Sequence, residues 1–598
     1  MPLVFTIQVF HLYSLGLLGY CWIQPKNIYH KQRGDMNDLN SWLNAIGSIL
    51  WHENVLYALL ITGLILTVWS GFSQYRALTH GVKVIRGDYD KPDDPGAITH
   101  FQALSTALSA TVGLGNIGGV ALAISLGGPG AIFWMWVVGF LGMAVKITEV
   151  SLSMLHRDTS DPENPNGGPM WVMSNNLIGR SKIIRTLGMG IAGTFSVALI
   201  INTFIAGNYF QAWNVGELTE QYFGIPSIVT GLILAVIVGA VIIGGIKRIG
   251  EVTSKLVPFM LTLYVLSCLL VLAFNFNQIP SMFALIFNAA FSPLEASNAF
   301  IGGAVGSAFM LGMQRALFSN EAGQGSSPVA HSAAKTKEPI REGVVAGLEP
   351  FVDTIVVCTM SALVILISGV WNRPAEIFIN EAVFTPVTPV SENEWQLSTD
   401  DSFYAQLSAD QNVFVVVSGD LNPQSGNTLS KVTGEVIYDN DKKAVTNIKW
   451  QKFTSEKKPQ LLDKELYIDY VGAMLTAKAF DKAFERNWPD LELGKWLVTL
   501  ASWLFAISTM ISWSYYGEKG VVFLMGQKSV LPYRIIFCLI IVFATLGFIK
   551  TNEELNSLSV IGTGVCLVAN LPIIWLFSHQ AMREYKQYIR KLKAGDFL

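Results

Sequence analysis

Long apolar runs recur along almost the whole of this chain. Each is close to the roughly 20 residues that an α-helix needs to cross the hydrocarbon core of a bilayer. The pattern predicts an all-α polytopic membrane protein. The eleven predicted spans lie near residues 53–73, 100–126, 130–155, 184–212, 226–246, 253–274, 298–319, 343–371, 491–516, 532–549 and 556–579.

The composition supports this fold class. Only 14% of the 598 residues are charged, whereas soluble domains average roughly 25%, and the mean hydropathy is +0.41. A net charge of −3 gives no basic surface for nucleic acid. All five cysteines fall in apolar runs, so no disulfide framework is expected.

The basic residues of the short loops predict the orientation in a cell membrane. They cluster after the first, third, fifth, seventh and ninth spans, and the alternating loops are acidic or nearly uncharged. By the positive-inside rule the first span begins outside, and the basic tail 580–598 is cytoplasmic. The apolar stretch within 1–35 has no basic region ahead of it. We therefore treat 1–35 as a doubtful extension: an optional extra span, a poor signal peptide or a wrongly assigned start. We prefer the last, with Met36 as the true start.

Residues 372–490 interrupt the apolar pattern. The segment is polar, and its period-two runs NVFVVVSGD and GEVIYDND predict strands. By the same loop count it is an external insert, and long loops are exempt from the charge rule. From Tyr470 the sequence predicts a short amphipathic helix that returns to the membrane.

The second predicted span contains SATVGLGNIGG, residues 109–119. Its glycines match G-x-G-x-x-G, but a dinucleotide site needs a preceding strand and an acidic residue about 20 positions later. Here a helical run precedes, and the next acid is Glu149. Glycines can also serve only close helix packing, which does not explain the polar residues Ser109, Thr111 and Asn116 among them. We expect the helix to break there and to line a site.

A second glycine-interrupted span begins at Gly302 and ends in the polar run 319–325. Two such helices in corresponding halves of a chain point to a transporter with inverted repeats. The first repeat would be 100–274, and the second would be 298–371 with 491–579. Residues 36–99 would add one amino-terminal helix and a cytoplasmic loop. Broken helices can hold a cation with carbonyl oxygens and a carboxylate with free amides.

The segment FAISTMISWSYYGE, from Phe505, carries hydroxyls on adjoining helix faces, with Trp513 eight residues after Phe505. Hydroxyl and carbonyl oxygens suit an alkali cation, and a tryptophan can cap a small pocket. Alternatively, the hydroxyls bond their own backbone and the tryptophan lies at the membrane interface.

Several of these blocks together resemble the alanine or glycine:cation symporter family, also called the sodium:alanine symporter family. They are the run from HFQALSTALSATVGLGNIGG to FLGM, then GGPMWVM, RALFSNEAGQGSSP and FAISTMISWSYYGE. The resemblance implies a LeuT-like fold of five plus five inverted helices with one added at the amino terminus. It also implies sodium-coupled, sometimes proton-coupled, uptake of alanine, glycine or a related small neutral amino acid. No other cofactor and no catalytic residue is implied.

The resemblance also assigns site residues. Substrate would contact Thr111, Gly113 and Gly115 in the first break, Phe309, Met310 and Met313 in the second broken helix, and Thr509 and Trp513 opposite. Sodium would bind at Ser109, Val112, Phe505, Ser508 and Thr509, with Asn116 as a weaker candidate. The chain departs from the expected family pattern at Ser307, Met310 and Leu311, where glutamine is expected, which leaves the substrate open.

Ionisable residues within the spans complete the prediction. Lys146 with Glu149, and Glu251 with Lys255, have the spacing of local ion pairs, whereas Asp353 is either a proton site or, preferred, a hydrogen-bonded packing residue. Two rival functions remain. A transporter-like receptor would bind an amino acid without accumulating it, and an intramembrane enzyme would need a metal cluster or an activated nucleophile that the sequence does not reveal.

Overall fold

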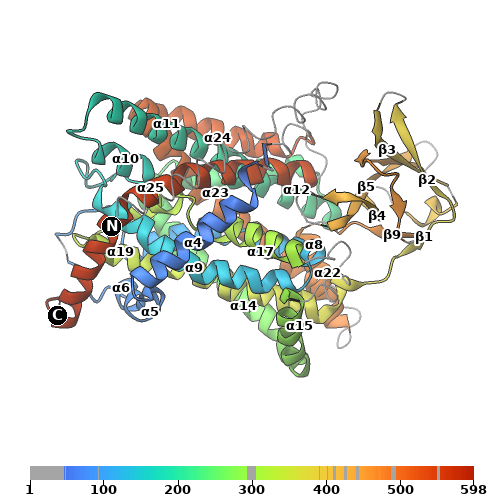
Figure 1. The fold of residues 1–598 in the computed structure, drawn as a ribbon, viewed down its shortest axis with the longest axis horizontal. Coiled ribbons are helices and arrows are strands. Elements are labelled where there is room, and N and C mark those ends of the chain that lie inside the picture. Colours follow the sequence, from blue (N-terminus) through green and yellow to red (C-terminus); the bar gives the residue numbers. More distant parts are fainter. Residues whose placement is uncertain are drawn as a thin grey trace.

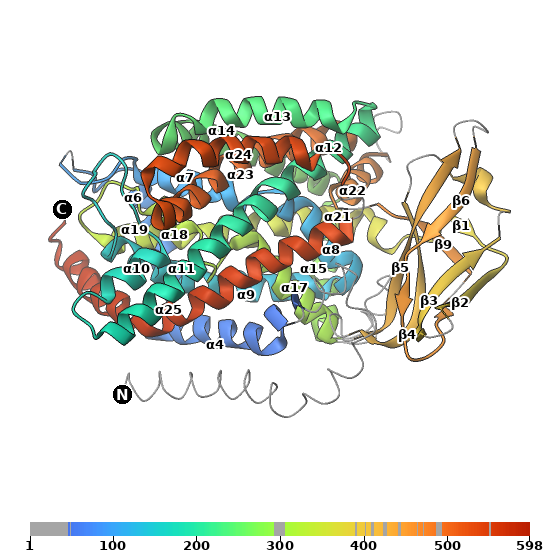
Figure 2. The ribbon, with the colours of Figure 1, turned by 90° about the horizontal axis from the view of Figure 1, so that it is seen from above.

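The computed structural model describes residues 46–47, 49–91, 93–291, 305–388, 391–400, 402–407, 412–422, 427–439, 444–462, 464–470, 472–485, 493–548 and 552–597. Most of them form a bundle of long helices, and a β unit lies at one end of it (Figure 1). The carboxyl terminus lies at the opposite end of the bundle (Figure 2). The doubtful extension 1–35 falls outside the described residues.

The helices of the first half run from α4 to α15. Their bounds are α4 (Glu53–Trp69), α5 (Ser73–Arg76), η1 (Ala77–Gly81), α6 (Val82–Ile85), α7 (His100–Thr111), η2 (Gly115–Gly119), α8 (Val120–Gly127), α9 (Gly130–Leu155), α10 (Pro169–Asn176), α11 (Lys182–Phe204), η3 (Ile205–Tyr209), α12 (Phe210–Phe223), α13 (Ser227–Ile242), α14 (Gly245–Phe274), η4 (Phe276–Gln278) and α15 (Ile279–Phe291).

Along the chain, the helices of the second half precede and follow the β unit, and the short η7 lies within it. Their bounds are α17 (Val305–Asn320), α18 (Ser327–His331), α19 (Pro339–Ala346), α20 (Leu348–Pro350), η5 (Phe351–Cys358), α21 (Thr359–Ser368), η6 (Val370–Asn372), η7 (Tyr404–Gln406), α22 (Ala473–Glu485), α23 (Leu493–Met525), η8 (Gln527–Ser529), α24 (Val530–Ala544) and α25 (Asn552–Ala594).

The β unit contains two antiparallel sheets. One has the order β1-β9-β4-β5-β6, with β8 also paired to β4, and the other has the order β2-β3-β7. The strands are β1 (Ile377–Phe378), β2 (Ala382–Thr388), β3 (Ser391–Thr399), β4 (Asn412–Asn422), β5 (Asn427–Asp439), β6 (Ala444–Trp450), β7 (Phe453–Thr454), β8 (Gln460–Leu461) and β9 (Glu465–Ile468). The predicted strands are confirmed as β4 and β5. Val413, Val415 and Val417 of β4 are fully buried, and the intervening Phe414 and Val416 are also buried, at 5% and 6% exposure.

All eleven predicted spans fall on helices. Within the described residues, seven helices are long and apolar enough to cross a membrane, or nine if each of two bent pairs counts as one span. The remaining two predicted spans correspond to α13 and α17, each of 16 residues. The predicted amphipathic helix is α22, whereas α15 was not predicted. The expected fold class, a helical polytopic membrane protein with a small β unit, is confirmed.

Candidate functional site

The first broken helix is interrupted where the sequence predicts. Helix α7 begins with a capping box in which Thr99 and Gln102 exchange hydrogen bonds, and it ends at Thr111 because Val112 is extended, with φ −78° and ψ 91°. The chain re-enters a helix through the π-helical η2, and the two halves are bent by 52°. Asn116 braces the break, since its Oδ1 accepts from the Gly113 amide at 2.9 Å. The regular helix is therefore interrupted between Thr111 and Gly115, in the buried interior of the bundle.

Two buried oxygens from other helices converge on this break. A Cβ added at Gly113 would lie 2.8 Å from Thr509 Oγ1 of α23 and 3.6 Å from Gln211 Oε1 of α12. Neither oxygen has a hydrogen-bond partner within the described part of the chain. Buried polar atoms are normally paired, so this convergence is typical of a site completed by a ligand. The sequence predicts a role in the site for Thr509 but contains no signal that would single out Gln211.

The predicted sodium residues also come together. Ser109 Oγ donates to the Ser508 carbonyl oxygen at 2.6 Å, which joins the end of α7 to the middle of α23. Ser508 Oγ donates to the Phe505 carbonyl at 2.9 Å and lies 3.4 Å from the Ser109 carbonyl. Val112, the extended residue that follows α7, lies three positions after Ser109. The cluster supplies only hydroxyl and carbonyl oxygens, which is the donor chemistry that an alkali cation requires at a broken helix.

The second interruption lies later than the glycines suggested. Gly312 is inside α17, and its lack of a side chain lets the Ala131 carbonyl of α9 approach, since a Cβ there would lie 2.3 Å from that oxygen. The helix ends at Asn320, and the chain turns through Glu321, Gly323 and Gly325, all with positive φ, before α18 begins. The break is therefore the polar run, and the expectation that Gly302 to Gly312 would interrupt the span was wrong for Gly312.

The second broken helix faces the first with residues other than those predicted. Phe318 lies 3.2 Å from the position of a Cβ on Gly115, and its ring packs against Phe210 with centroids 5.5 Å apart. Phe309 instead stacks on Tyr57 of α4 at 5.4 Å and contacts Trp134 of α9. Met310 and Met313 are buried in the main core.

Asp353 connects the two breaks. Its carboxylate accepts from Ser319 Oγ of α17 at 2.8 Å, from Asn116 Nδ2 of η2 at 2.5 Å and from Thr354 Oγ1 at 2.8 Å. It is completely buried. The expectation of a hydrogen-bonded Asp353 is confirmed, and the Asn116 amide is directed at this carboxylate.

Trp513 and Thr111 differ in how directly they meet the break. Trp513 Nε1 donates to the Ala110 carbonyl at 3.3 Å, so the indole lies against the end of α7. Its ring fills the space beside Gly207, where a Cβ would lie 2.4 Å from Trp513 Cγ. Thr111 Oγ1 bonds back to the Ala107 carbonyl at 3.3 Å, which is the ordinary behaviour of threonine in a membrane helix.

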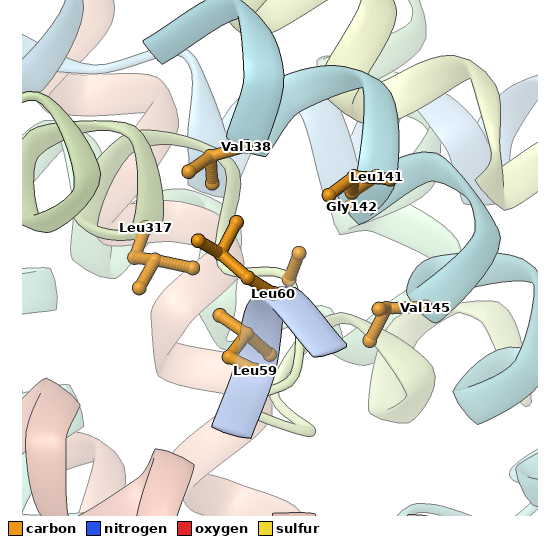
Figure 3. Close-up of a pocket in the computed structure, with 8 residues that line it drawn as sticks. Leu59, Leu60, Val138, Leu141, Gly142, Val145 and Leu317 are labelled. Carbon is orange, nitrogen blue, oxygen red and sulfur yellow. The ribbon is translucent and has the colours of Figure 1, made fainter. Parts of the chain in front are cut away.

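A separate small cavity lies between α4, α9 and α17 (Figure 3). Its lining is wholly apolar and consists of Leu59, Leu60, Val138, Leu141, Gly142, Val145, Leu317 and Ala322. Without a polar group it cannot orient a charged or zwitterionic ligand. The break at 109–119 is therefore the better candidate for the functional site.

Two interrupted helices that meet in the core of a multi-pass bundle, with hydroxyl and carbonyl oxygens gathered at the first break, are the architecture of a transporter. A sequence model of the sodium:alanine symporter family matches residues 36–390 and 463–597, and the chain belongs to that family. The unmatched stretch, 391–462, lies within the β unit.

Curated relatives agree with this assignment. The chain is 33% identical to the sodium/alanine symporter AgcS of Methanococcus maripaludis, over 94% of this chain and 100% of the relative. It is 35% identical to the probable sodium/glutamine symporter GlnT of Bacillus subtilis, over 54% of this chain and 65% of the relative. Among solved structures, that of MhsT in complex with L-phenylalanine matches with 10% identity and a TM-score of 0.46, over 81% of this chain and 89% of that one. The relatives are transporters, not enzymes.

Proposed function

We propose that this chain is a sodium-coupled symporter that imports a small neutral amino acid, with alanine and glycine as the first candidates. The observation that carries the proposal is the convergence of the unpartnered Thr509 and Gln211 oxygens on Gly113. These acceptors suit the ammonium group of an amino acid, and the first amides of the half helix that begins at η2 suit its carboxylate.

The surroundings favour a small substrate. Phe318 covers Gly115 and pairs with Phe210, the neighbour of Gln211. Trp513 lies against the end of α7 on the α23 side. We infer that these rings restrict the side chain that a substrate can carry. Family membership and the name of the 33% identical relative point to alanine, and that of the other relative to glutamine.

Sodium and substrate would share one structural element. The proposed sodium ligands Ser109, Val112, Phe505, Ser508 and Thr509 flank Gly113, which lies in the proposed pocket. Sodium would fix the end of α7 against α23 and so order the pocket, and by thermodynamic linkage each ligand would raise the affinity for the other. Asp353 would hold the two broken helices in register through Asn116 and Ser319.

The orientation belongs to the same proposal. Its support is the distribution of basic residues, which would put the β unit outside the cell membrane and the basic tail 580–598, with the end of α25, on the cytoplasmic side. We likewise propose that two five-helix repeats move against each other and so open the binding site to one side of the membrane at a time. The repeats are residues 100–274 and residues 298–371 with 491–579.

The deciding experiment is uptake into proteoliposomes. Radiolabelled alanine, glycine, serine and glutamine would each be presented with an inward sodium gradient and with equal sodium on both sides. Accumulation above equilibrium that needs the gradient is expected for alanine or glycine. Binding without accumulation would favour the receptor alternative, and absence of accumulation for all four would overturn the proposal.

A further inference from the structure

A chain of buried charged side chains is centred on His331, the last residue of α18. Its Nδ1 lies 2.5 Å from Glu342 Oε1 and its Nε2 lies 2.6 Å from Glu349 Oε1. The three side chains are completely shielded from solvent. We call His331, Glu342 and Glu349 the His331 latch. It is separate from the proposed sodium and substrate residues.

The geometry of the latch requires an extra proton. A neutral imidazole carries one N–H and one lone pair, so it can donate to only one carboxylate. The second nitrogen would then direct its lone pair at a carboxylate oxygen at hydrogen-bond distance, in a fully buried place that bulk solvent does not reach. Both contacts are attractive only if the imidazole carries two protons or if one glutamate is protonated. Either way, the latch holds one proton more than a neutral histidine between two carboxylates.

The neighbouring charges also favour that proton. Glu349 Oε2 lies 3.3 Å from Lys146 Nζ, and Lys146 lies 3.8 Å from Glu149 in the local pair that the sequence predicts. Glu342 also bonds to His100. Without a proton on the latch, three buried carboxylates would face a single lysine and His100, and unpaired buried charge is costly. The other charged or titratable groups around the cluster are Glu321, Arg157 and Tyr516.

The latch joins parts of the chain that the breaks separate. His331 ends the short helix after the second break, and Glu342 and Glu349 lie on α19 and α20. Glu342 also hydrogen-bonds to His100, the first residue of α7, and α7 leads into the first break. Glu349 also accepts from Ser327 Oγ at 2.8 Å. The proton therefore connects the half helices that lead into one break and out of the other.

A route to solvent exists at one end of the chain of groups. His100 Nε2 lies 3.8 Å from Asp90 Oδ1, and the Asp90 side chain is 44% exposed. The series of groups that leads from Glu342 through His100 therefore ends beside a partly exposed carboxylate. A metal ion is not an alternative occupant, because the described histidines, cysteines and carboxylates form no group of three arranged to hold one.

We propose that the His331 latch is a proton-binding site that fastens α7 to α18, α19 and α20, and that the transporter works only while this proton is bound. The ligand is a proton drawn from the solvent next to Asp90. The proposal goes beyond sodium-coupled transport, and its stability consequence holds whether or not the amino acid is alanine.

The sign of the pH dependence follows from the environment of His331, which lies outside the helices counted as spans. Burial alone would lower the pKa of His331, but the carboxylates of Glu349 and Glu342 outweigh burial and raise it from 6.5 to about 9. A raised pKa stabilises the folded state fully below the unfolded value of 6.5, and that stabilisation is lost as the pH rises through about 9. At pH 10 roughly one molecule in ten keeps the proton.

The test compares the wild type with the double variant His331→Gln/Glu342→Gln. In the double variant, the amide introduced at 331 can donate to Glu349, and its carbonyl oxygen can accept from the amide introduced at 342. The hydrogen bonds are thereby restored without a titrating proton. The single variant His331→Gln leaves an oxygen facing a carboxylate and is expected to be unstable. Initial alanine uptake at a fixed sodium gradient would be measured at pH 7 and at pH 10, with equal pH on both sides, and Tm would be measured at the same pH values.

The expected result is a loss of wild-type uptake between pH 7 and pH 10 that is about tenfold larger than in the double variant. The substrate's own deprotonation affects both proteins equally. The wild-type Tm should also fall more steeply with pH than that of the double variant. Equal pH profiles would overturn the proposal. If the double variant does not fold, a wild-type Tm that is unchanged between pH 7 and pH 10 would overturn it. A chain that shows no alanine uptake but keeps the Tm difference would contradict the proposed substrate and leave the latch supported.

Discussion

Replacing Gly113 by alanine tests the location of the substrate pocket most directly. The new Cβ would lie 2.8 Å from Thr509 Oγ1, whereas ordinary van der Waals contacts begin near 3.4 Å. The backbone of Gly113 is not left-handed, so the substitution adds volume without backbone strain. The methyl group would also occupy space between the Thr509 and Gln211 oxygens that we assign to the substrate.

The magnitude follows from the overlap. Adding a methyl group to a packed site costs about 1–3 kcal/mol. If the substrate bears this cost, its dissociation constant rises roughly 5- to 150-fold, since about 1.4 kcal/mol corresponds to a factor of ten. Alanine should be affected more than glycine, because its own methyl group competes for the same volume.

The assay is the KM for alanine and for glycine in proteoliposomes under a saturating sodium gradient. Gly193→Ala is the matched control, because a Cβ at Gly193 in helix α11 would meet no atom within 4 Å. Gly193→Ala should leave both KM values unchanged. An unchanged KM for alanine in Gly113→Ala would refute the placement of the pocket at the first break.

Three further predictions address the other parts of the site. Replacing Ser508 and Thr509 together by alanine removes two hydroxyl ligands. Each hydrogen-bond-like contact to a charge contributes about 1.5–3 kcal/mol, so the sodium concentration for half-maximal uptake should rise at least roughly tenfold. Ser514→Ala is the control, because among the described residues that hydroxyl bonds only the Ile511 carbonyl of its own helix. Equal sodium activation in both variants would argue against the assignment. Trp513→Leu should admit larger neutral amino acids, measured by competition with labelled alanine; unaltered selectivity would place the pocket wall elsewhere. Joining β1 to β9 by a short turn should remove most of the β unit without loss of transport. The deletion is feasible because Phe378 and Glu465 are register partners in neighbouring strands. Transport should survive because the hydrogen bond to the Ile117 carbonyl comes from Thr476 of α22, which the deletion keeps. Loss of uptake in a correctly folded protein would show that the β unit is more than an appendage.

The positions of the helices and of the first break follow from local properties of the sequence. An apolar run must satisfy its backbone polar groups internally in lipid, so it becomes a helix whatever surrounds it. Asn116 and the adjacent glycines likewise mark the break, because the Asn116 side chain bonds the Gly113 amide only three residues away. The run of β-branched valines that predicts β4 is equally local.

Residues whose role depends on a distant partner could not be assigned in this way. Asn116 and Asp353 are 237 residues apart in sequence, yet they are hydrogen-bonded. In the sequence, Gln211 cannot be distinguished from other polar residues of helices. Only the folded structure places it beside Gly113 and Thr509. Phe309 is an aromatic residue of the kind that lines pockets, but its ring faces Tyr57 and Trp134. The rotation of α17 about its axis is set by packing against α9.

The sequence by itself thus determined that the chain is a helical membrane protein, where its predicted spans lie and that the span at 100–126 breaks, since each depends on neighbouring residues only. The tertiary structure decided which oxygens meet at that break and that His331 lies between two buried glutamates. Those arrangements depend on how helices far apart in the chain pack together, and no local pattern records the direction in which a buried side chain will face.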